Sequence, residues 1–173
     1  MLLRLESNTE LLGVILRKNN HSQMTINKNI IHNSITENIN SRIKKIKEAI
    51  LEQRESLKTA SESTAGDKHN TSRAMMHIEE EKLNRQLAKL FQLKQVMNQF
   101  NPKNRLSIIA LGSLVETNNG WIYFAIPFGK LITKEFEIMV VSLASPIGQI
   151  LFNKKVGDSV QLNGKKWEIR QVV

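Results

Sequence analysis

The sequence contains no cysteine and few aromatic residues, and these two shortages exclude several kinds of site. Without cysteine, the chain can form no disulfide, thiolate metal site or cysteine nucleophile. Aromatic residues make up only 5% of its 173 residues, which disfavours the stacking of bases on an aromatic platform. The sequence also has no glycine-rich phosphate loop, nucleophile elbow or zinc-finger spacing. The residues themselves therefore offer no recognisable catalytic motif.

Long apolar runs are also missing. The best candidate, residues 11–16, is far shorter than the ~20 residues that cross a bilayer. Glu6 and Glu10 precede it, which is the wrong charge for the start of a signal peptide. We predict a cytoplasmic protein with no membrane partner.

The chain is short of negative charge. It has 25 Lys and Arg against 16 Asp and Glu, a net charge of +9. Such an excess favours polyanionic partners, namely nucleic acid, an acidic protein surface or anionic lipid. Simple solubility of a lysine-rich protein explains the same excess, so composition leaves both interpretations open.

The first residues differ in character from the rest of the chain. Residues 24–31 open a more coherent stretch, and we interpret Met24 as the start of the functional protein, with the preceding residues accessory or a product of start-site choice. We assign residues 1–34 to an N-terminal extension that is partly disordered or a short helix.

Two stretches of heptad-type spacing predict an antiparallel helical hairpin over residues 35–100. One helix is expected over residues 35–61 and the other over residues 72–99, each arm roughly 40 Å long. Residues 61–72 are small and polar, which favours a turn, so the tip lies near residues 62–72. The stripes are Ile39, Ile43, Ile46, Ile50 and Leu57, then Met76, Leu83, Leu87, Leu90 and Met97, with Gln53 interrupting the first.

The other faces of the first helix are basic. They suit nucleic-acid phosphates or the wall of an acidic channel. The alternative is a solvated face whose charges pair with the three glutamates at residues 79–81. The basic residues are Arg42, Lys44, Lys45 and Lys47.

Residues 101–173 predict a separate α+β domain. Pro102 ends the second helix, and the apolar period then becomes two. A core this small is marginal alone, so we expect it to pack against the base of the hairpin. Turn signals lie at residues 118–120 and 163–164. The expected strands are residues 106–111, 113–117, 120–126, 137–142 and 165–172; residues 146–152 form a short helix, and the core side chains are Trp121, Phe124, Phe136 and Trp167.

Three segments of this domain resemble the C-terminal domain of the bacterial Gre transcript-cleavage factors. They are residues 108–115 (Ile-Ile-Ala-Leu-Gly-Ser-Leu-Val), residues 145–148 (Ser-Pro-Ile-Gly) and residues 154–172, which contain Lys-Lys-Val-Gly-Asp. The resemblance covers residues 39–173 and is architectural over the hairpin. It implies an antiparallel coiled coil followed by an FKBP-like α+β domain.

The resemblance also implies a partner and a mechanism. In Gre factors, the C-terminal domain docks at the rim of the RNA polymerase secondary channel and the coiled coil enters it. Acidic residues at the tip help to hold a magnesium ion that activates water, so that the polymerase cleaves backtracked RNA. The resemblance thus implies that this protein is not itself an enzyme but acts on the polymerase. It would be a monomer without a cofactor of its own, with magnesium only within the polymerase. Nascent RNA and template DNA are indirect partners.

The tip matches the Gre pattern only in part. Gre tips carry an Asp followed three residues later by a Glu; here Asp67 matches the first position and the neutral Asn70 occupies the second. Glu62 is a substitute from the other arm. Asp67 also suits a helix cap or turn. His69 lies beside it, but a lone loop histidine is usually solvated, and no other histidine gives a metal-ligand spacing.

The resemblance assigns Ser145, Pro146, Ile147 and Gly148 to polymerase contact. The same residues fit a helix start, with Ser145 as the N-cap and Pro146 in the first turn. Gly157 and Asp158 are expected to form the turn after that helix.

Several functions remain open at this stage. A Gre-like regulator with this tip stimulates cleavage, inhibits the polymerase, or occupies the channel without chemistry. An FKBP-like interaction or scaffold protein with a dimerising coiled coil is the alternative from another class. A peptidyl-prolyl isomerase is disfavoured, because Gre domains share that fold without the activity.

Overall fold

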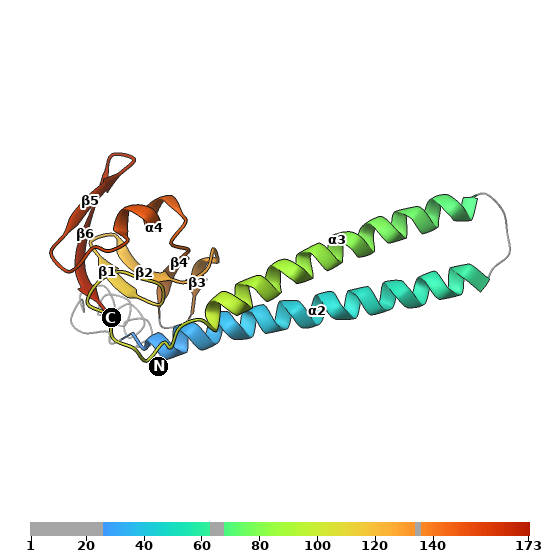
Figure 1. Ribbon diagram of the computed structural model, residues 1–173, viewed down its shortest axis with the longest axis horizontal. Helices are drawn as coiled ribbons and strands as arrows, with labels where there is room; N and C mark the ends of the chain where they lie inside the picture. Colours follow the sequence, from blue (N-terminus) through green and yellow to red (C-terminus); the bar gives the residue numbers. More distant parts are fainter. Residues whose placement is uncertain (1–25, 63–67, 134–135) are drawn as a thin grey trace, which may run out of the picture.

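A long helical hairpin projects from a small sheet domain (Figure 1). The computed structural model describes residues 26–62, 68–133 and 136–173. The hairpin consists of α2 (Lys28–Glu62) and α3 (Lys68–Met97). The remaining elements are β1 (Leu114–Thr117), β2 (Gly120–Phe124), β3 (Gly129–Ile132), β4 (Glu137–Val141), α4 (Pro146–Leu151), β5 (Ser159–Leu162) and β6 (Lys165–Val172).

Helix α2 is longer than its sequence pattern predicts. It has 35 residues, about 52 Å at 1.5 Å per residue, and begins seven residues before the expected start. The side chain of Asn27 accepts a hydrogen bond from the main-chain N–H of Asn29 at 2.9 Å, which caps the helix. Ile31 and Ile35 are fully buried in the earlier turns. The apolar stripe therefore continues toward the N-terminus, because the sheet domain covers it there.

The contact between α2 and α3 changes character along the hairpin. Near the sheet, apolar side chains such as Ile39 and Leu90 are buried. Further out, the Nε2 of Gln53 donates a hydrogen bond to the main-chain oxygen of Met76 at 2.6 Å. The residue that interrupts the apolar stripe thus joins the two arms through a polar contact.

The glutamates at residues 79–81 do not pair with the lysines of α2, which corrects that interpretation of the sequence. Among the described residues, only Glu80 reaches across, to Arg54 at 2.7 Å. Glu79 pairs with Lys82 and Glu81 with Arg85, both within α3. Spacings of three and four residues place those partners on the same helix face, closer than any lysine of α2.

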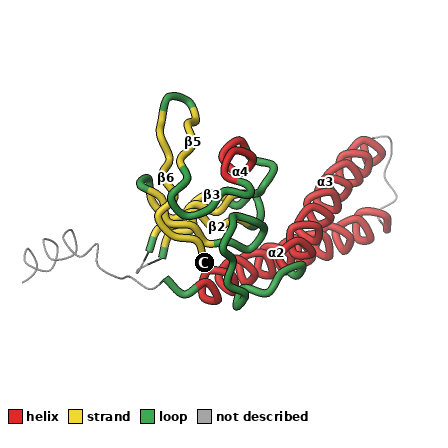
Figure 2. The backbone as a smooth tube through the Cα atoms, turned by 60° about the vertical axis from the view of Figure 1, so that its left-hand side comes forward, coloured by secondary structure: helices red, strands yellow, loops and turns green. Residues whose placement is uncertain are grey.

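The second part of the described chain is a six-stranded mixed sheet, so the protein belongs to the α+β class (Figure 2). The strand order is β3-β4-β2-β1-β6-β5; β2 and β4 are parallel, and the other neighbours are antiparallel. The turn at residues 163–164 is confirmed, since Asn163 and Gly164 both have positive φ, as a two-residue hairpin requires.

One expected strand is absent from the described part of the chain, and two observed strands were not expected. Residues 106–111 form no strand and contribute one bridge, between Ile108 and Lys155. The two edge strands, β3 and β5, were not predicted. Each has only four residues and no fully buried side chain, so its periodic signal is too short to identify a strand, even in β5, where polar and apolar residues alternate.

The sheet buries side chains on both faces. Tyr123 packs toward the base of the hairpin with Ile31 and Ile35, whereas Phe124 packs toward α4 with Leu151. The expectation that the small domain packs against the hairpin base is confirmed. The aromatic core is partly corrected: Phe124 is fully buried, but Trp121, Phe136 and Trp167 are only half-buried, and Tyr123 takes the central position.

Candidate functional site

The residues proposed for polymerase contact lie at the start of α4, where β4 ends. The Oγ of Ser145 accepts a hydrogen bond from the main-chain N–H of Gly148 at 3.1 Å and donates one to the main-chain oxygen of Ser142 at 2.7 Å. Ser145 is therefore the N-cap, and Pro146 takes the first turn. The helix start expected from the sequence is confirmed.

The four residues of this segment divide into two roles. Ile147 and Gly148 are buried, and a Cβ at Gly148 would lie only 2.2 Å from the main-chain oxygen of Ser142. No side chain fits there, so glycine lets α4 lie directly on the end of β4. Ser145 is half-buried and Pro146 is exposed. Only the first two residues of the segment are accessible to a partner.

Sequence reasoning missed an exposed aromatic residue beside this segment. Gln149 and Phe152 follow Pro146 at intervals of three, so all three lie along one side of the short helix. Gln149 and Pro146 are exposed, and Phe152 is 44% exposed. An exposed phenylalanine and an exposed proline on one side of α4, with Gln149 between them, offer a surface with both apolar and polar groups to a partner.

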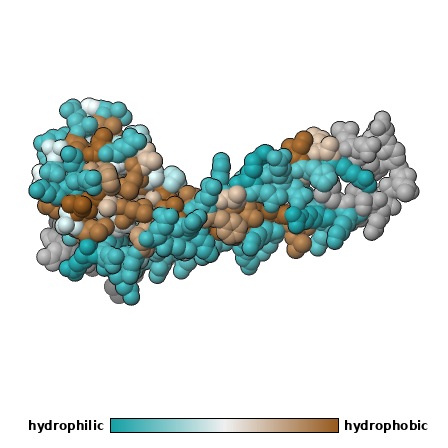
Figure 3. Space-filling view, in the orientation of Figure 1, coloured by the Kyte–Doolittle hydropathy of each residue, from teal (hydrophilic) through white to brown (hydrophobic). Residues whose placement is uncertain are grey.

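The hairpin carries the predicted basic face. Arg42, Lys44, Lys45 and Lys47 are all exposed on α2. Lys44 lies 3.8 Å from Glu48, and the Nζ of Lys47 lies 5.6 Å from the centre of the Phe91 ring. No ion pair links Arg42 or Lys45 to a carboxylate within the described part of the chain. Figure 3 shows a largely hydrophilic hairpin surface interrupted by apolar patches.

The tip residues fall at the edge of the described ranges. Asp67 lies outside the described residues, and Lys68, the next residue, begins α3. Glu62 is the last residue of α2, and Asn70 lies in the first turn of α3. The proposed magnesium role of Asp67 and Glu62 therefore stays a prediction. Over residues 26–62, 68–133 and 136–173, no group of three His, Asp or Glu side chains could hold a metal ion.

An aromatic cluster fixes the base of the hairpin to the sheet. The rings of His32 in α2 and Phe100 after α3 meet edge to face at 5.3 Å, and Phe100 meets Tyr123 of β2 at 6.3 Å. The Nδ1 of His32 lies 3.3 Å from the hydroxyl oxygen of Tyr123. Burial lowers the pKa of His32 and raises that of Tyr123, so both stay neutral at pH 7.

Gly112 completes this cluster, which we call the junction and which comprises His32, Phe100, Gly112 and Tyr123. Its φ is +87°, and a Cβ there would lie 2.6 Å from the Cδ2 of Phe100. The main chain of Gly112 therefore packs directly against the Phe100 ring. Because the junction joins both arms to the central strand, it sets the direction in which the hairpin leaves the sheet domain.

No helix in the described ranges has the length and apolar character needed to span a bilayer. Neither a protein-family model nor a curated protein sequence matches this chain.

Proposed function

We propose that this protein is a Gre-like regulator of RNA polymerase. The start of α4 docks at the rim of the secondary channel, and the α2–α3 hairpin enters the channel toward the active site. An FKBP-like topology of the sheet domain is part of this proposal. The observation that carries it is the combination of an antiparallel hairpin about 50 Å long with a small sheet domain to which its base is packed.

The geometry supports such a role in two ways. The junction packs the base of the hairpin against β2. The hairpin is therefore held in a fixed direction relative to the sheet domain, rather than attached through a flexible linker. The accessible Pro146 and Phe152 lie in the sheet domain, away from the tip. The docking surface and the hairpin tip thus lie on separate parts of the molecule. This arrangement suits a protein that binds outside a channel and reaches inside it.

The chemistry at the tip rests on Asp67. One carboxylate can complete the oxygen shell of a magnesium ion that the polymerase already holds, where it helps to generate hydroxide near neutral pH. Asn70 supplies a neutral amide oxygen, a weaker ligand than the Glu of Gre tips. We therefore expect weak stimulation of cleavage, with occupancy of the channel as a second effect.

Transcript cleavage in a backtracked complex tests this proposal. Purified bacterial polymerase is stalled on a backtracked template, and RNA cleavage is followed with and without the protein. Wild type should raise the cleavage rate, Asp67→Ala should abolish the increase, and Asn70→Glu should enlarge it by restoring the second carboxylate. Asn70→Ala is the matched control: it changes the same position without adding a carboxylate, so it should not raise the rate above that of wild type.

Competition with a Gre factor separates the alternatives. A protein that does not raise cleavage, yet displaces a Gre factor and loses this ability in Phe152→Ala, occupies the channel without chemistry. A protein that neither binds nor competes contradicts the proposal. The scaffold alternative then predicts a concentration-dependent dimer in sedimentation, whereas the hairpin within one chain predicts a monomer.

A further inference from the structure

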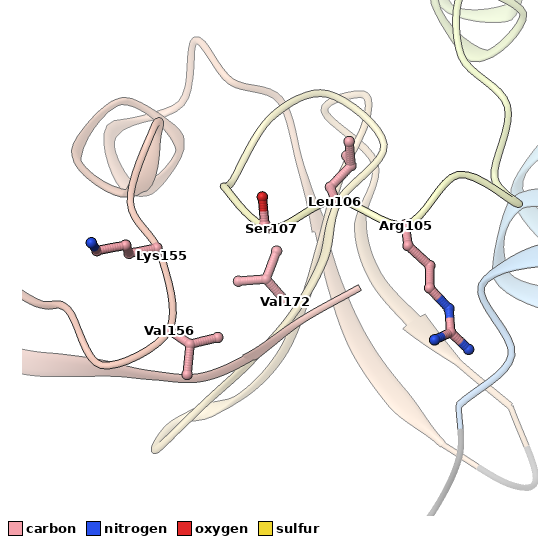
Figure 4. Close-up of a pocket in the computed structure, with 6 residues that line it drawn as sticks. All are labelled: Arg105, Leu106, Ser107, Lys155, Val156 and Val172. Atoms are coloured by element: carbon pink, nitrogen blue, oxygen red, sulfur yellow. The ribbon is translucent and has the colours of Figure 1, made fainter.

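A shallow groove lies on the sheet domain, and none of its lining residues belongs to α4 (Figure 4). Its volume is about 580 Å³. Three segments that are distant in sequence line it: the connection after α3, the turn before β5 and the end of β6. The lining residues are Arg105, Leu106, Ser107, Lys155, Val156 and Val172.

The groove combines exposed apolar surface with cations. Val156 is 53% exposed and the neighbouring Ile108 is 46% exposed. Arg105 and Lys155 are exposed, and no ion pair joins either to a carboxylate among the described residues. Asp158, the nearest acid in sequence, accepts a hydrogen bond from the main-chain N–H of Lys155 rather than from its ammonium group. A segment that carries both apolar and acidic side chains complements this surface.

The described chain enters α2 at the edge of this groove. Lys28, in the first turn of α2, is only 6% exposed. Its Nζ donates hydrogen bonds to the main-chain oxygens of Asn104 at 2.5 Å and Val173 at 2.9 Å. Asn104 precedes Arg105 and Val173 follows Val172, so both contacts adjoin groove residues. Figure 4 shows the Arg105 side chain pointing toward the side where the chain enters α2.

The 25 residues before Ile26 contain a segment of the required chemistry. Residues 2–16 hold two glutamates, Glu6 and Glu10, among many aliphatic side chains. Residues 17–25 connect this segment to Ile26 and can span up to about 30 Å when extended. Tethering at this distance corresponds to a millimolar effective concentration. The aliphatic residues are Leu2, Leu3, Leu5, Leu11, Leu12, Val14, Ile15 and Leu16.

We propose that residues 2–16 bind in this groove of the same chain. Leucine side chains cover Val156, and Glu6 and Glu10 approach Arg105 and Lys155. The inference goes beyond polymerase binding and does not depend on it. It also gives residues 2–16 a role: a truncated variant that lacks them should leave the groove uncovered.

Disulfide trapping tests the proposal. The chain has no cysteine of its own, so only the two introduced cysteines can form a disulfide. Val156→Cys is combined with Leu5→Cys or Leu12→Cys in the full chain, which is oxidised mildly at low concentration. A disulfide requires the two Cα atoms to come within about 7 Å. We expect an intramolecular disulfide for at least one pair, forming at least about tenfold faster than the matched control in which Gln149→Cys replaces Val156→Cys.

A second readout needs no cysteine. Docking shields Arg4 from trypsin, so Val156→Asp should speed cleavage after Arg4 in the full chain, whereas Gln149→Asp should not. Val156 is exposed, so its substitution leaves the fold intact. Equal trapping rates at Val156 and Gln149 overturn the proposal, as does the absence of trapping. A disulfide dimer whose yield rises with concentration overturns it in favour of a second copy.

Discussion

Replacing Gly112 with alanine should loosen the junction and measurably destabilise the protein. Gly112 has a φ of +87°, and an added Cβ would meet the Cδ2 of Phe100 at 2.6 Å. The Phe100 ring cannot move aside freely, because it packs edge to face against His32 and Tyr123. The substitution therefore imposes both backbone strain and a steric clash.

The expected cost is the sum of these two effects. A non-glycine residue in the left-handed region costs about 1–2 kcal/mol. Forcing a methyl group into a packed site costs about 1–3 kcal/mol more. The total, about 2–5 kcal/mol, is a large share of the stability of a typical domain. If the free energy of unfolding falls by about 2 kcal/mol per molar urea, the unfolding midpoint should fall by about 1–2.5 M.

Urea unfolding followed by circular dichroism measures this shift, and Gly164→Ala is the matched control. Gly164 has a φ of +76° but nothing within 4 Å of the position that an added methyl group would take, so it reports the backbone strain alone. In a Phe100→Leu background, Gly112→Ala should cost less, because the clashing ring is gone. Equal costs for Gly112→Ala and Gly164→Ala, or no relief in the Phe100→Leu background, would refute the reasoning.

Two further predictions concern the helix cap and the buried histidine. Ser145→Ala removes the cap of α4 and should lower the free energy of unfolding, measured in urea, by about 1 kcal/mol. Ser159→Ala, in an exposed strand position, is the control and should lower it hardly at all. Equal losses in the two variants would show that the cap does not stabilise the protein. Burial holds the pKa of His32 below 6.5 in the folded protein. Below pH 6.5, the unfolded chain therefore binds the proton more readily than the folded one. The free energy of unfolding should be greatest above pH 6.5 and should decline as the pH falls below 6.5. The urea midpoint should therefore drop less between pH 7.5 and 5.5 in His32→Gln than in wild type. His77→Gln, which changes an exposed histidine, is the control. If the drop in His32→Gln equals that of wild type, His32 is not the source of the pH dependence.

Elements held by short-range interactions were the ones that could be predicted from the sequence. The hairpin was predictable because heptad spacing is read within one helix, and the cap at Ser145 because its partner, Gly148, is three residues away. The turn at residues 163–164 depends on two adjacent residues. The pairing of residues 79–81 with the lysines of α2 was predicted wrongly: Glu79 and Glu81 pair with nearer partners within α3, and Glu80 pairs across the hairpin with Arg54.

The candidate docking segment also shows that burial, which depends on distant contacts, could not be predicted from the sequence. Ser145 and Pro146 were identified from their order in the chain, but the sequence did not distinguish the accessible pair from the buried Ile147 and Gly148. Phe152 was missed as an exposed neighbour because its exposure depends on which surface the rest of the sheet domain leaves uncovered. The tip residue Asp67 remains a prediction from the sequence and the Gre resemblance.

The sequence by itself determined the elements whose contacts are local: two amphipathic helices, the tight turns and the capped start of α4. Only the tertiary structure decided where α2 begins, which strands form the edges of the sheet, and how the hairpin is fixed to it. Those features depend on contacts such as Lys28 with Asn104, 76 residues apart, and Lys28 with Val173, 145 residues apart. Periodicity reports which face of an element is buried, but residues so distant meet only when the whole chain has folded, and no local pattern specifies their partners.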